Sequence, residues 1–369
     1  RARGHNRRLV LGQLQGGAHL GRAEIARRTG LTTQAVSNIV DALETEGFLR
    51  AAGTASGRRG LPAVQYALAP GGGHALGIEI RPGAVLATLV DLSGAVLWEA
   101  RDALDRADPD MVAARATALK DAALSATRPA RLMGAGAVMP GPFGRTEISG
   151  AAADLPGWED VDAPALFADA LGCETVVEND ANAAASAERM AMAAEGIETF
   201  ACLYFGTGLG LAIVQDGRAV TGAFGNAGEI GQVPLPDGRP LEAALSRLSV
   251  ERHLAAADVA APDTDSLAAL HAAAHPALDA WLDGAAAALT HALAIIESLL
   301  DPRRTVLCGA LPETVMRDLV ARTALPRTVA RRPDNPGPAL AIGTCSRMAA
   351  ARGAAALVLA RAFTSAFAA

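Results

Sequence analysis

The stretch FACLYFGTGLGLAIVQDG, residues 200–217, decides the architecture of the larger part of this chain. Its apolar run Phe200–Phe205 predicts a buried strand, and residues 211–215 predict a second strand. A glycine-rich turn, Gly206-Thr207-Gly208, separates them, and Asp216-Gly217 suits the two-residue turn of a hairpin. The pattern therefore predicts a pair of strands beside a loop whose backbone amides could cradle phosphate.

The region before this stretch shows the same succession of elements. We expect three strands, at 75–80, 84–91 and 95–101, joined by short turns that contain glycine. A helix at about 109–127 and a strand at 132–138 follow, and α/β alternation continues beyond them. A strand meander that passes into α/β alternation predicts an α/β fold with a mixed sheet.

Three short helical patterns and a wing come first in the chain, ahead of a glycine linker at 71–73. We expect a helix at 6–15 with Asn6 as its N-cap, and a second helix at 22–29 that Gly30 ends. A third helix, capped by Thr32 or Thr33, has one buried face, made of Val36, Ile39, Val40 and Leu43. Residues 51–68 have the alternation of a β-wing, with its tip at 57–62. The segment is therefore predicted to be a winged helix-turn-helix.

The charge and the exposed side chains of this segment point to DNA. Residues 1–70 hold ten arginines against four acidic residues, a net charge of +6 in a chain of net charge −6, which leaves −12 for the remainder. We expect short and amide side chains to read bases from the third helix, and two wing arginines to contact phosphates or the minor groove. These residues are Thr33, Gln34, Ser37, Asn38, Arg58 and Arg59. The alternative is that the module contacts protein, as other helix-turn-helix domains do.

The composition excludes several classes of protein. With 369 residues, 51% of them hydrophobic and 20% charged, the chain suits two or three globular domains and no disordered polymer. Its four cysteines are far apart in sequence, which predicts neither a disulfide framework nor a cysteine zinc site. Charged residues interrupt the apolar stretch 277–300, so we expect a buried or amphipathic helix there and no membrane span. No signal-peptide pattern is present, and we expect a cytoplasmic protein.

Four segments of the body resemble the ROK family, which comprises repressors and sugar kinases with a two-lobed, actin-like ATPase (ribonuclease H-like) fold. Residues 138–142 with 155–158 resemble the sugar-side loop of the family, and 177–183 its catalytic segment. Residues 205–210 resemble its second phosphate loop, and 222–231 its segment for sugar binding and a zinc ligand. The four occur in the family's order, and the resemblance extends over residues 75 to about 350. The preceding winged helix resembles the arrangement of ROK repressors.

The resemblance implies a sugar site. Asn179, Asp180 and Glu229 match sugar contacts of the family, and Asp180 matches the base of its kinases. Glu242 matches a further glutamate, and Gln232 replaces a histidine that contacts both sugar and metal. Such carboxylates and amides suit a polyol, because they can pair with several hydroxyl groups at once. The alternatives are that Asp180 caps a helix and that Glu229 and Glu242 are solvated.

The resemblance fails where kinase chemistry requires it. Residues 79–85 replace the family's D-x-G-G-T-K phosphate loop, and Pro82 there lacks the N–H that could bind phosphate. Residues 307–311 replace its adenosine-side glycine run. Gly231-Gln232 and the following loop lack the histidine and cysteines of its zinc site. We therefore predict no kinase activity, with Asp180 as a vestigial base, and neither a metal nor another cofactor.

The combined expectation is a sugar-sensing transcription regulator, most simply a repressor of carbohydrate metabolism. We expect a DNA-binding domain at 1–70, a first lobe at 74–186 completed by a C-terminal helix at about 350–369, and a second lobe at 187–349. The expected partners are a palindromic operator, a sugar or sugar-derivative effector and a second copy, as a homodimer or dimer of dimers; we expect no membrane. The alternatives are a sugar kinase with a DNA-binding domain and a DNA-binding dimer that needs no ligand.

Overall fold

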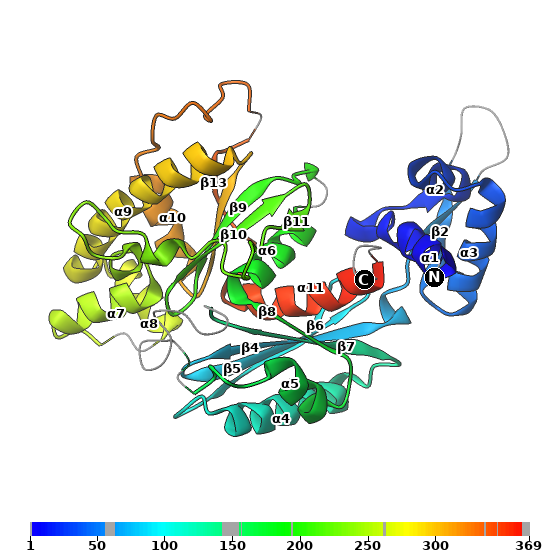
Figure 1. The fold of residues 1–369 in the computed structure, drawn as a ribbon, viewed down its shortest axis with the longest axis horizontal. Coiled ribbons are helices and arrows are strands. Elements are labelled where there is room, and N and C mark those ends of the chain that lie inside the picture. The colour runs from blue at the N-terminus through cyan, green and yellow to red at the C-terminus, as the bar shows by residue number, and fades with distance from the viewer. Residues whose placement is uncertain are drawn as a thin grey trace.

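The structure, a computed structural model, describes residues 2–55, 63–141, 155, 157–192, 195–260, 263–335, 337–344 and 346–363. Its described part forms a small N-terminal domain and two lobes, each built on a five-stranded sheet. Figure 1 shows the N-terminal domain beside the lobes, next to the C-terminal helix. This is the predicted α/β architecture, a winged helix-turn-helix followed by a two-lobed body.

The N-terminal domain has three helices and a three-stranded sheet of order β1-β3-β2. Thr32 caps the third helix, because its side chain accepts a hydrogen bond from Ala35 N, and Gly30 ends the second in the left-handed region. The predicted first helix is wrong in its bounds, since Asn6 lies inside a helix that begins earlier and ends at Gly12. The elements are α1 (Ala2–Gly12), η1 (Gln15–Gly17), β1 (Leu20–Gly21), α2 (Arg22–Thr29), α3 (Thr33–Thr45), β2 (Leu49–Ala55) and β3 (Ala63–Leu68).

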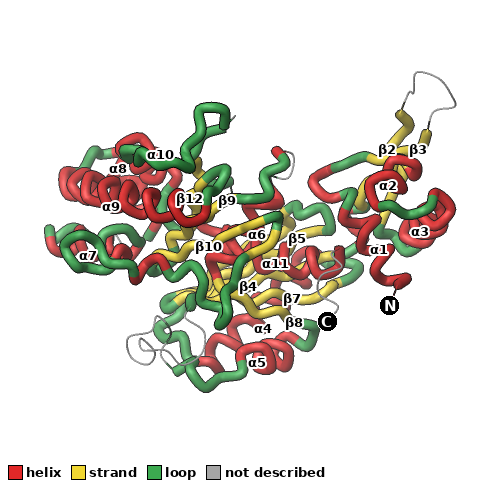
Figure 2. The backbone as a smooth tube through the Cα atoms, turned by 45° about the horizontal axis from the view of Figure 1, so that its top comes forward, coloured by secondary structure: helices red, strands yellow, loops and turns green. Residues whose placement is uncertain are grey.

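The first lobe has strand order β6-β5-β4-β7-β8, with the strands from β4 to β6 antiparallel and those from β4 to β8 parallel. Helices α4 (Pro109–Thr127) and α5 (Ala163–Leu171) cover one face of this sheet, and α11 (Ala349–Phe363) covers the other (Figure 2). The predicted meander and the mixed sheet are confirmed. The elements are β4 (His74–Arg81), β5 (Ala84–Asp91), β6 (Val96–Ala103), α4 (Pro109–Thr127), β7 (Leu132–Met139), α5 (Ala163–Leu171), β8 (Thr175–Asn179) and α11 (Ala349–Phe363).

Glycines allow α11 to lie directly on this sheet. A Cβ on Gly77 of β4 would lie 1.9 Å from the carbonyl oxygen of Ala351, and one on Gly136 of β7 would lie 2.1 Å from that of Ala354. Both distances are far below any real contact, so larger residues would push the helix away. Close packing of this kind joins the end of the chain to the middle of the first lobe.

The second lobe has strand order β11-β10-β9-β12-β13. The predicted hairpin is present: Asp216 and Gly217 both have positive φ, and the flanking residues Gln215 and Arg218 pair. The elements are β9 (Phe200–Phe205), β10 (Leu209–Gln215), β11 (Arg218–Ala219), η5 (Ile230–Gln232), η6 (Leu241–Ala243), α7 (Arg247–Ala256), α8 (Thr264–Ala272), α9 (Pro276–Leu300), β12 (Thr305–Gly309), α10 (Glu313–Arg322), β13 (Leu340–Ile342) and η7 (Ser346–Met348).

Alternate residues of β9 pack into two different hydrophobic cores. Ala201, Leu203 and Phe205 pack with α9 and its neighbours, because successive strand residues point to opposite faces. The other face of β9 packs against helix α6 (Asp180–Ala191), which lies between the two sheets and also contacts α11. One helix thus connects the second sheet to the C-terminal helix on the first.

Helix α9 is long and apolar enough to cross a membrane by length and composition, and it is the single such helix in the described part of the chain. Half of its most apolar window is buried inside the protein. Its buried face, which includes Leu282, Leu289 and Ile296, lies in the core of the second lobe. The expectation of a buried or amphipathic helix at 277–300 is confirmed.

The N-terminal domain shares a hydrophobic core with the first lobe. Val10 and Leu14 of α1 belong to one buried cluster with Val90 and Leu92 of the first lobe and Leu359 of α11. The predicted linker forms a short 3-10 turn, η2 (Pro70–Gly72), and it packs so closely that a Cβ on Gly72 would lie 2.2 Å from the Gly47 carbonyl. The N-terminal domain is therefore packed onto the body.

Candidate functional site

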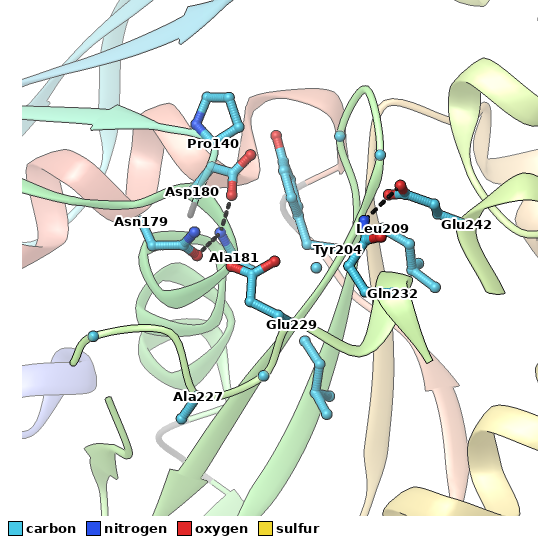
Figure 3. Close-up of a pocket in the computed structure, with 17 residues that line it drawn as sticks. Pro140, Asn179, Asp180, Ala181, Tyr204, Leu209, Ala227, Glu229, Gln232 and Glu242 are labelled. Atoms are coloured by element: carbon cyan, nitrogen blue, oxygen red, sulfur yellow. Dashed lines mark hydrogen bonds between the residues drawn. The ribbon is translucent and has the colours of Figure 1, made fainter. Parts of the chain in front are cut away.

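One cavity between the lobes is lined by all five residues predicted to bind sugar. The walls come from the end of β7, the start of α6, the glycine loop after β9, and the segment from Gly225 to Glu242. Figure 3 shows Asn179, Asp180 and Glu229 grouped on one side, with Gln232 and Glu242 together on the other. The fold thus brings together residues that lie up to 63 positions apart in sequence.

The first side of the cavity is the N-terminus of α6. Asn179 is the N-cap, because its Oδ1 accepts hydrogen bonds from Ala181 N (2.9 Å) and Asn182 N (3.2 Å). Asp180 follows, and its Oδ1 also accepts from Ala181 N at 2.8 Å. The alternative that Asp180 caps the helix is wrong, since Asn179 takes this position. The positive end of the helix dipole favours the Asp180 carboxylate where it lines the cavity.

Two glycines place Glu229 against this group. Gly228 has φ of +98°, and a Cβ there would lie 1.8 Å from the Leu211 carbonyl oxygen, so no other residue fits without displacing β10. Gly141, after β7, would carry a Cβ 2.6 Å from Glu229 Oε1 and 3.2 Å from Asn179 Nδ2. The absence of side chains at these two positions lets the carboxylate and the amide approach the same space.

The second side is a hydrogen-bonded pair. Gln232 Nε2 donates to Glu242 Oε1 at 2.7 Å, from the end of η5 to the middle of η6. The loop between them closes as a tight hairpin with a bridge between Pro234 and Pro240. The Gln232 amide therefore positions the Glu242 carboxylate. This is the region where the resemblance implied that the zinc site of the family is missing.

The cavity is small, at about 80 Å³, whereas ligand sites span roughly 300–1,000 Å³. In the predicted sugar-side loop, at 138–142 and 155–158, residues 142 and 156 lie outside the described residues, as does the segment 143–154 between its two parts. Trp158, at its end, belongs to the core of the first lobe, where it stacks on Phe167 and donates to the Ala107 carbonyl (2.8 Å). Its role in the fold is packing.

A buried polar cluster, which the sequence did not reveal, lies between the two lobes. The Arg81 guanidinium donates through Nε to Glu79 Oε1 (2.5 Å), and through Nη2 to the Tyr204 hydroxyl (3.2 Å) and the Arg347 carbonyl (2.8 Å). The Tyr204 hydroxyl itself donates to Glu79 Oε1 at 2.5 Å. Arg81 and Glu79 are on β4 and Tyr204 is on β9, so the cluster joins the two sheets.

Charges within this cluster stabilise one another. Burial disfavours charge on Arg81, but Glu79 and Tyr204 outweigh it and raise the pKa of Arg81 above its usual value. Burial, together with the negative charges of Glu79 and Asp180, raises the pKa of Tyr204 well above its usual value. The phenol is therefore neutral and acts as a donor to Glu79.

The predicted base-reading residues lie on the exposed N-terminal part of α3. Thr33, Gln34 and Asn38 are exposed and Ser37 is half-buried, while Val36 and Val40 on the opposite face are buried. Gln34 Nε2 donates to Asn38 Oδ1 at 3.0 Å, which aligns the two amides on one face. The wing arginines Arg58 and Arg59 lie outside the described residues.

Known proteins resemble this chain in sequence over much of its length. A protein of Sinorhizobium fredii (strain NBRC 101917 / NGR234) is 29% identical over 309 residues, which are 81% of this chain and 76% of that protein. The xylose repressor of Bacillus spizizenii (strain ATCC 23059 / NRRL B-14472 / W23) is 23% identical over 238 residues, 62% of this chain and 60% of the repressor. The chain thus spans less than two thirds of the length of that repressor.

Solved structures share the fold. A ROK family transcriptional regulator, homologous to the E. coli MLC protein, superposes with a TM-score of 0.70 at 18% identity, covering 98% of each chain. A ROK hexokinase from Thermus thermophilus gives 0.56 at 25% identity, covering 77% of this chain and 97% of the hexokinase. The MarR family pattern matches residues 6–60 and the ROK family pattern matches residues 75–361. This chain belongs to the ROK family, as a member that carries a winged helix ahead of its two-lobed body.

Proposed function

We propose that this protein is a transcription regulator that binds an operator through its winged helix and senses a sugar in the cavity between its lobes, without phosphorylating it. The observation that carries the proposal is the union of two features. The domain that carries the exposed helix α3 is packed by a shared core onto a body whose interlobe cavity is lined by Asn179, Asp180 and Glu229.

The ligand is argued from the chemistry of the cavity. Two carboxylates and an amide on one side, with the Gln232–Glu242 pair on the other, offer many acceptors and a few donors to neighbouring hydroxyl groups. Sugars match this arrangement, whereas apolar ligands would leave buried polar groups without partners. A xylose repressor is among the relatives, so pentoses and hexoses are the first classes to test.

The loss of kinase activity is argued from Arg81. Its side chain turns inward to Glu79, Tyr204 and the Arg347 carbonyl, at the position where kinases of the family would receive phosphate oxygens. Pro82 follows and has no N–H to donate. The glycine loop at 206–210 remains, but a single cradle does not hold a triphosphate in line for transfer.

The coupling is argued from α6. This helix carries Asp180 at its N-terminus, packs along α11, and α11 in turn shares the buried cluster with α1 of the DNA-binding domain. The cavity has only about 80 Å³, so a sugar must bind a more open arrangement of the lobes. A ligand that prefers the open state shifts the population toward it, and α6 and α11 carry that change to the winged helix.

The partners follow from the recognition helix. One helix reads few base pairs, so we propose a homodimer, or a dimer of dimers, on a palindromic operator. Gln34→Ala should weaken binding to a selected operator duplex by about 1–3 kcal/mol, as expected for the loss of a base contact. Gln215→Ala, an exposed glutamine on β10, is the matched control and should bind as the wild type does. Equal affinity of all three proteins would contradict the assignment of α3.

The sugar assignment is tested by thermal unfolding against pentoses, hexoses, amino sugars and sugar phosphates, with ATP in parallel. A sugar at a hundred times its Kd should add about 2.7 kcal/mol of stability. Asp180→Asn keeps the acceptor for Ala181 N but loses the charge, and should abolish the shift. Asp169→Asn, an exposed aspartate on α5, is the matched control.

Each alternative function predicts a different result. A kinase would turn over ATP and yield phosphorylated sugar, which mass spectrometry would detect. A DNA-binding dimer that needs no ligand would show no shift with any sugar, and its operator affinity would be unchanged by them. Either result would refute the sensor.

A further inference from the structure

A second cavity lies at the junction of the DNA-binding domain and the body, away from the sugar site. Its volume is about 530 Å³, within the roughly 300–1,000 Å³ of ligand pockets. Gln15 and Gly16 of η1 contribute one wall, and β5, β6, α6 and α11 contribute the others. Figure 1 shows the N-terminal domain next to α11 at this junction.

The walls are largely apolar. Val90, Val96, Met190 and Leu359 line the cavity together with several alanines, and none of the described residues that line it is acidic. Two arginines, Arg189 and Arg352, are the charged groups among these lining residues. The local charge is therefore positive, in a body that is otherwise strongly acidic.

The two arginines differ in their partners. Arg352 is committed to Glu99, with Nε 2.8 Å from Oε1 and Nη2 3.3 Å from Oε2. Arg189, near the C-terminal end of α6, is half-buried, and no hydrogen bond or ion pair to it is found within the part of the chain that the structure describes. The negative charge of Glu198 acts on Arg189 electrostatically, without a hydrogen bond.

A half-buried guanidinium without a partner is costly, because charge removed from water needs compensation. Burial accordingly lowers the pKa of Arg189, and Glu198 offsets this only in part. Arginine presents a planar fork of donors that matches a carboxylate. The same cavity offers apolar walls for the remainder of a ligand, and the described residues that line it include no second uncommitted cation for a dianion.

We propose that this junction cavity is a second effector site, which binds a small organic acid with one carboxylate on an apolar body. The carboxylate pairs with Arg189, and the apolar body packs against Val90, Met190 and Leu359. Because η1 of the DNA-binding domain forms part of the wall, an acid bound there contacts both that domain and the body. The site is independent of the proposed sugar cavity.

The test is isothermal titration calorimetry of the full chain with sodium benzoate and sodium hexanoate, with benzyl alcohol and hexanol as neutral controls. We expect the acids to bind and the alcohols to bind at least tenfold more weakly. Arg189→Met, which keeps the length of the side chain, should weaken the acids at least tenfold, while Arg189→Lys should retain part of the affinity. Arg218→Gln, at an exposed arginine on β11, is the matched control and should bind as the wild type does.

Two further variants make the result decisive. Val96→Trp narrows the cavity from a position that is 40% exposed, and it should abolish binding even if Arg189→Met does not fold. Asp180→Asn should leave acid binding unchanged, so that a failure of the sugar proposal does not affect this one. If neither acid binds the wild type, or if Val96→Trp and a folded Arg189→Met bind as tightly as the wild type, the proposal is wrong.

Discussion

Replacing Arg81 with methionine should destabilise the body strongly, although the residue has no partner in its own sequence neighbourhood beyond Glu79. Glu79 is 1% exposed and the Arg81 side chain is 17% exposed, so the pair is held away from water. Arg81→Met removes three hydrogen bonds and leaves the Glu79 carboxylate with Tyr204 as its donor. Removal of one partner from a buried ion pair costs about 3–5 kcal/mol, which is the expected loss.

The assay is urea denaturation of the full chain, followed by circular dichroism and by tryptophan fluorescence from the lobes. The double variant Glu79→Gln, Arg81→Met removes the buried charge as well and should recover about 1–3 kcal/mol of the loss. Arg101→Met, at an exposed position on β6, is the matched control and should stay within about 0.5 kcal/mol of the wild type.

Two results would refute this reasoning. A loss below about 1 kcal/mol for Arg81→Met would mean that water or movement of the lobes compensates Glu79 without the guanidinium. A double variant that is less stable than Arg81→Met would mean that the Glu79 carboxylate is not the group left uncompensated. In either case Arg81 would not tie the two sheets together, and the argument against a phosphate site would lose its structural support.

Three further predictions concern local features. Thr32→Ala should cost about 1 kcal/mol in thermal unfolding, because it removes the cap of α3. Gly353→Ala should cost about 1–3 kcal/mol in urea, since the added Cβ would lie 1.7 Å from the Ala183 carbonyl and push α11 from α6. The hydrogen bond from Arg27, with a second arginine, lowers the pKa of Glu24 to about 2. The contribution of the ionised Glu24 carboxylate to folding stability should be present above pH 4.5 and be lost as pH falls toward 2, as NMR titration of this carboxyl would show.

Local patterns explain how much of the fold was predictable. The alternation and glycine turns of residues 75–101 and 200–217 specify strands and hairpins that depend mainly on neighbours in sequence. The helices at 22–29 and 109–127 follow in the same way from apolar periodicity and caps. The bounds of α1 were not predictable, because its first turn has no apolar periodicity and Asn6 can serve inside a helix as well as at its cap.

The residues of the candidate site were predicted by their resemblance to a family, and their grouping in one cavity is a result of the fold. Asp180 was expected as a ligand residue or a helix cap, and the cap proved to be its neighbour Asn179. Gly141 and Gly228 were not identified as constraints, since only the approach of Glu229 and of the Leu211 carbonyl shows why a side chain is excluded there.

By itself, the sequence determined that a winged helix precedes an α/β body, and it determined the strands at 75–101 and 200–217 that depend on local alternation and turns. Only the tertiary structure decided which distant side chains meet. Arg81 donates a hydrogen bond to Tyr204, which is 123 positions away in sequence. Cys202 Sγ lies 3.3 Å from Cys308 Sγ, although no cysteine motif joins the two residues. Arg189 lines a cavity without a hydrogen-bond or ion-pair partner among the described residues, which no local pattern indicates. Periodicity acts over a few residues, whereas burial and the pairing of charges depend on how sheets and helices pack. The energies of these contacts are therefore determined by the tertiary structure.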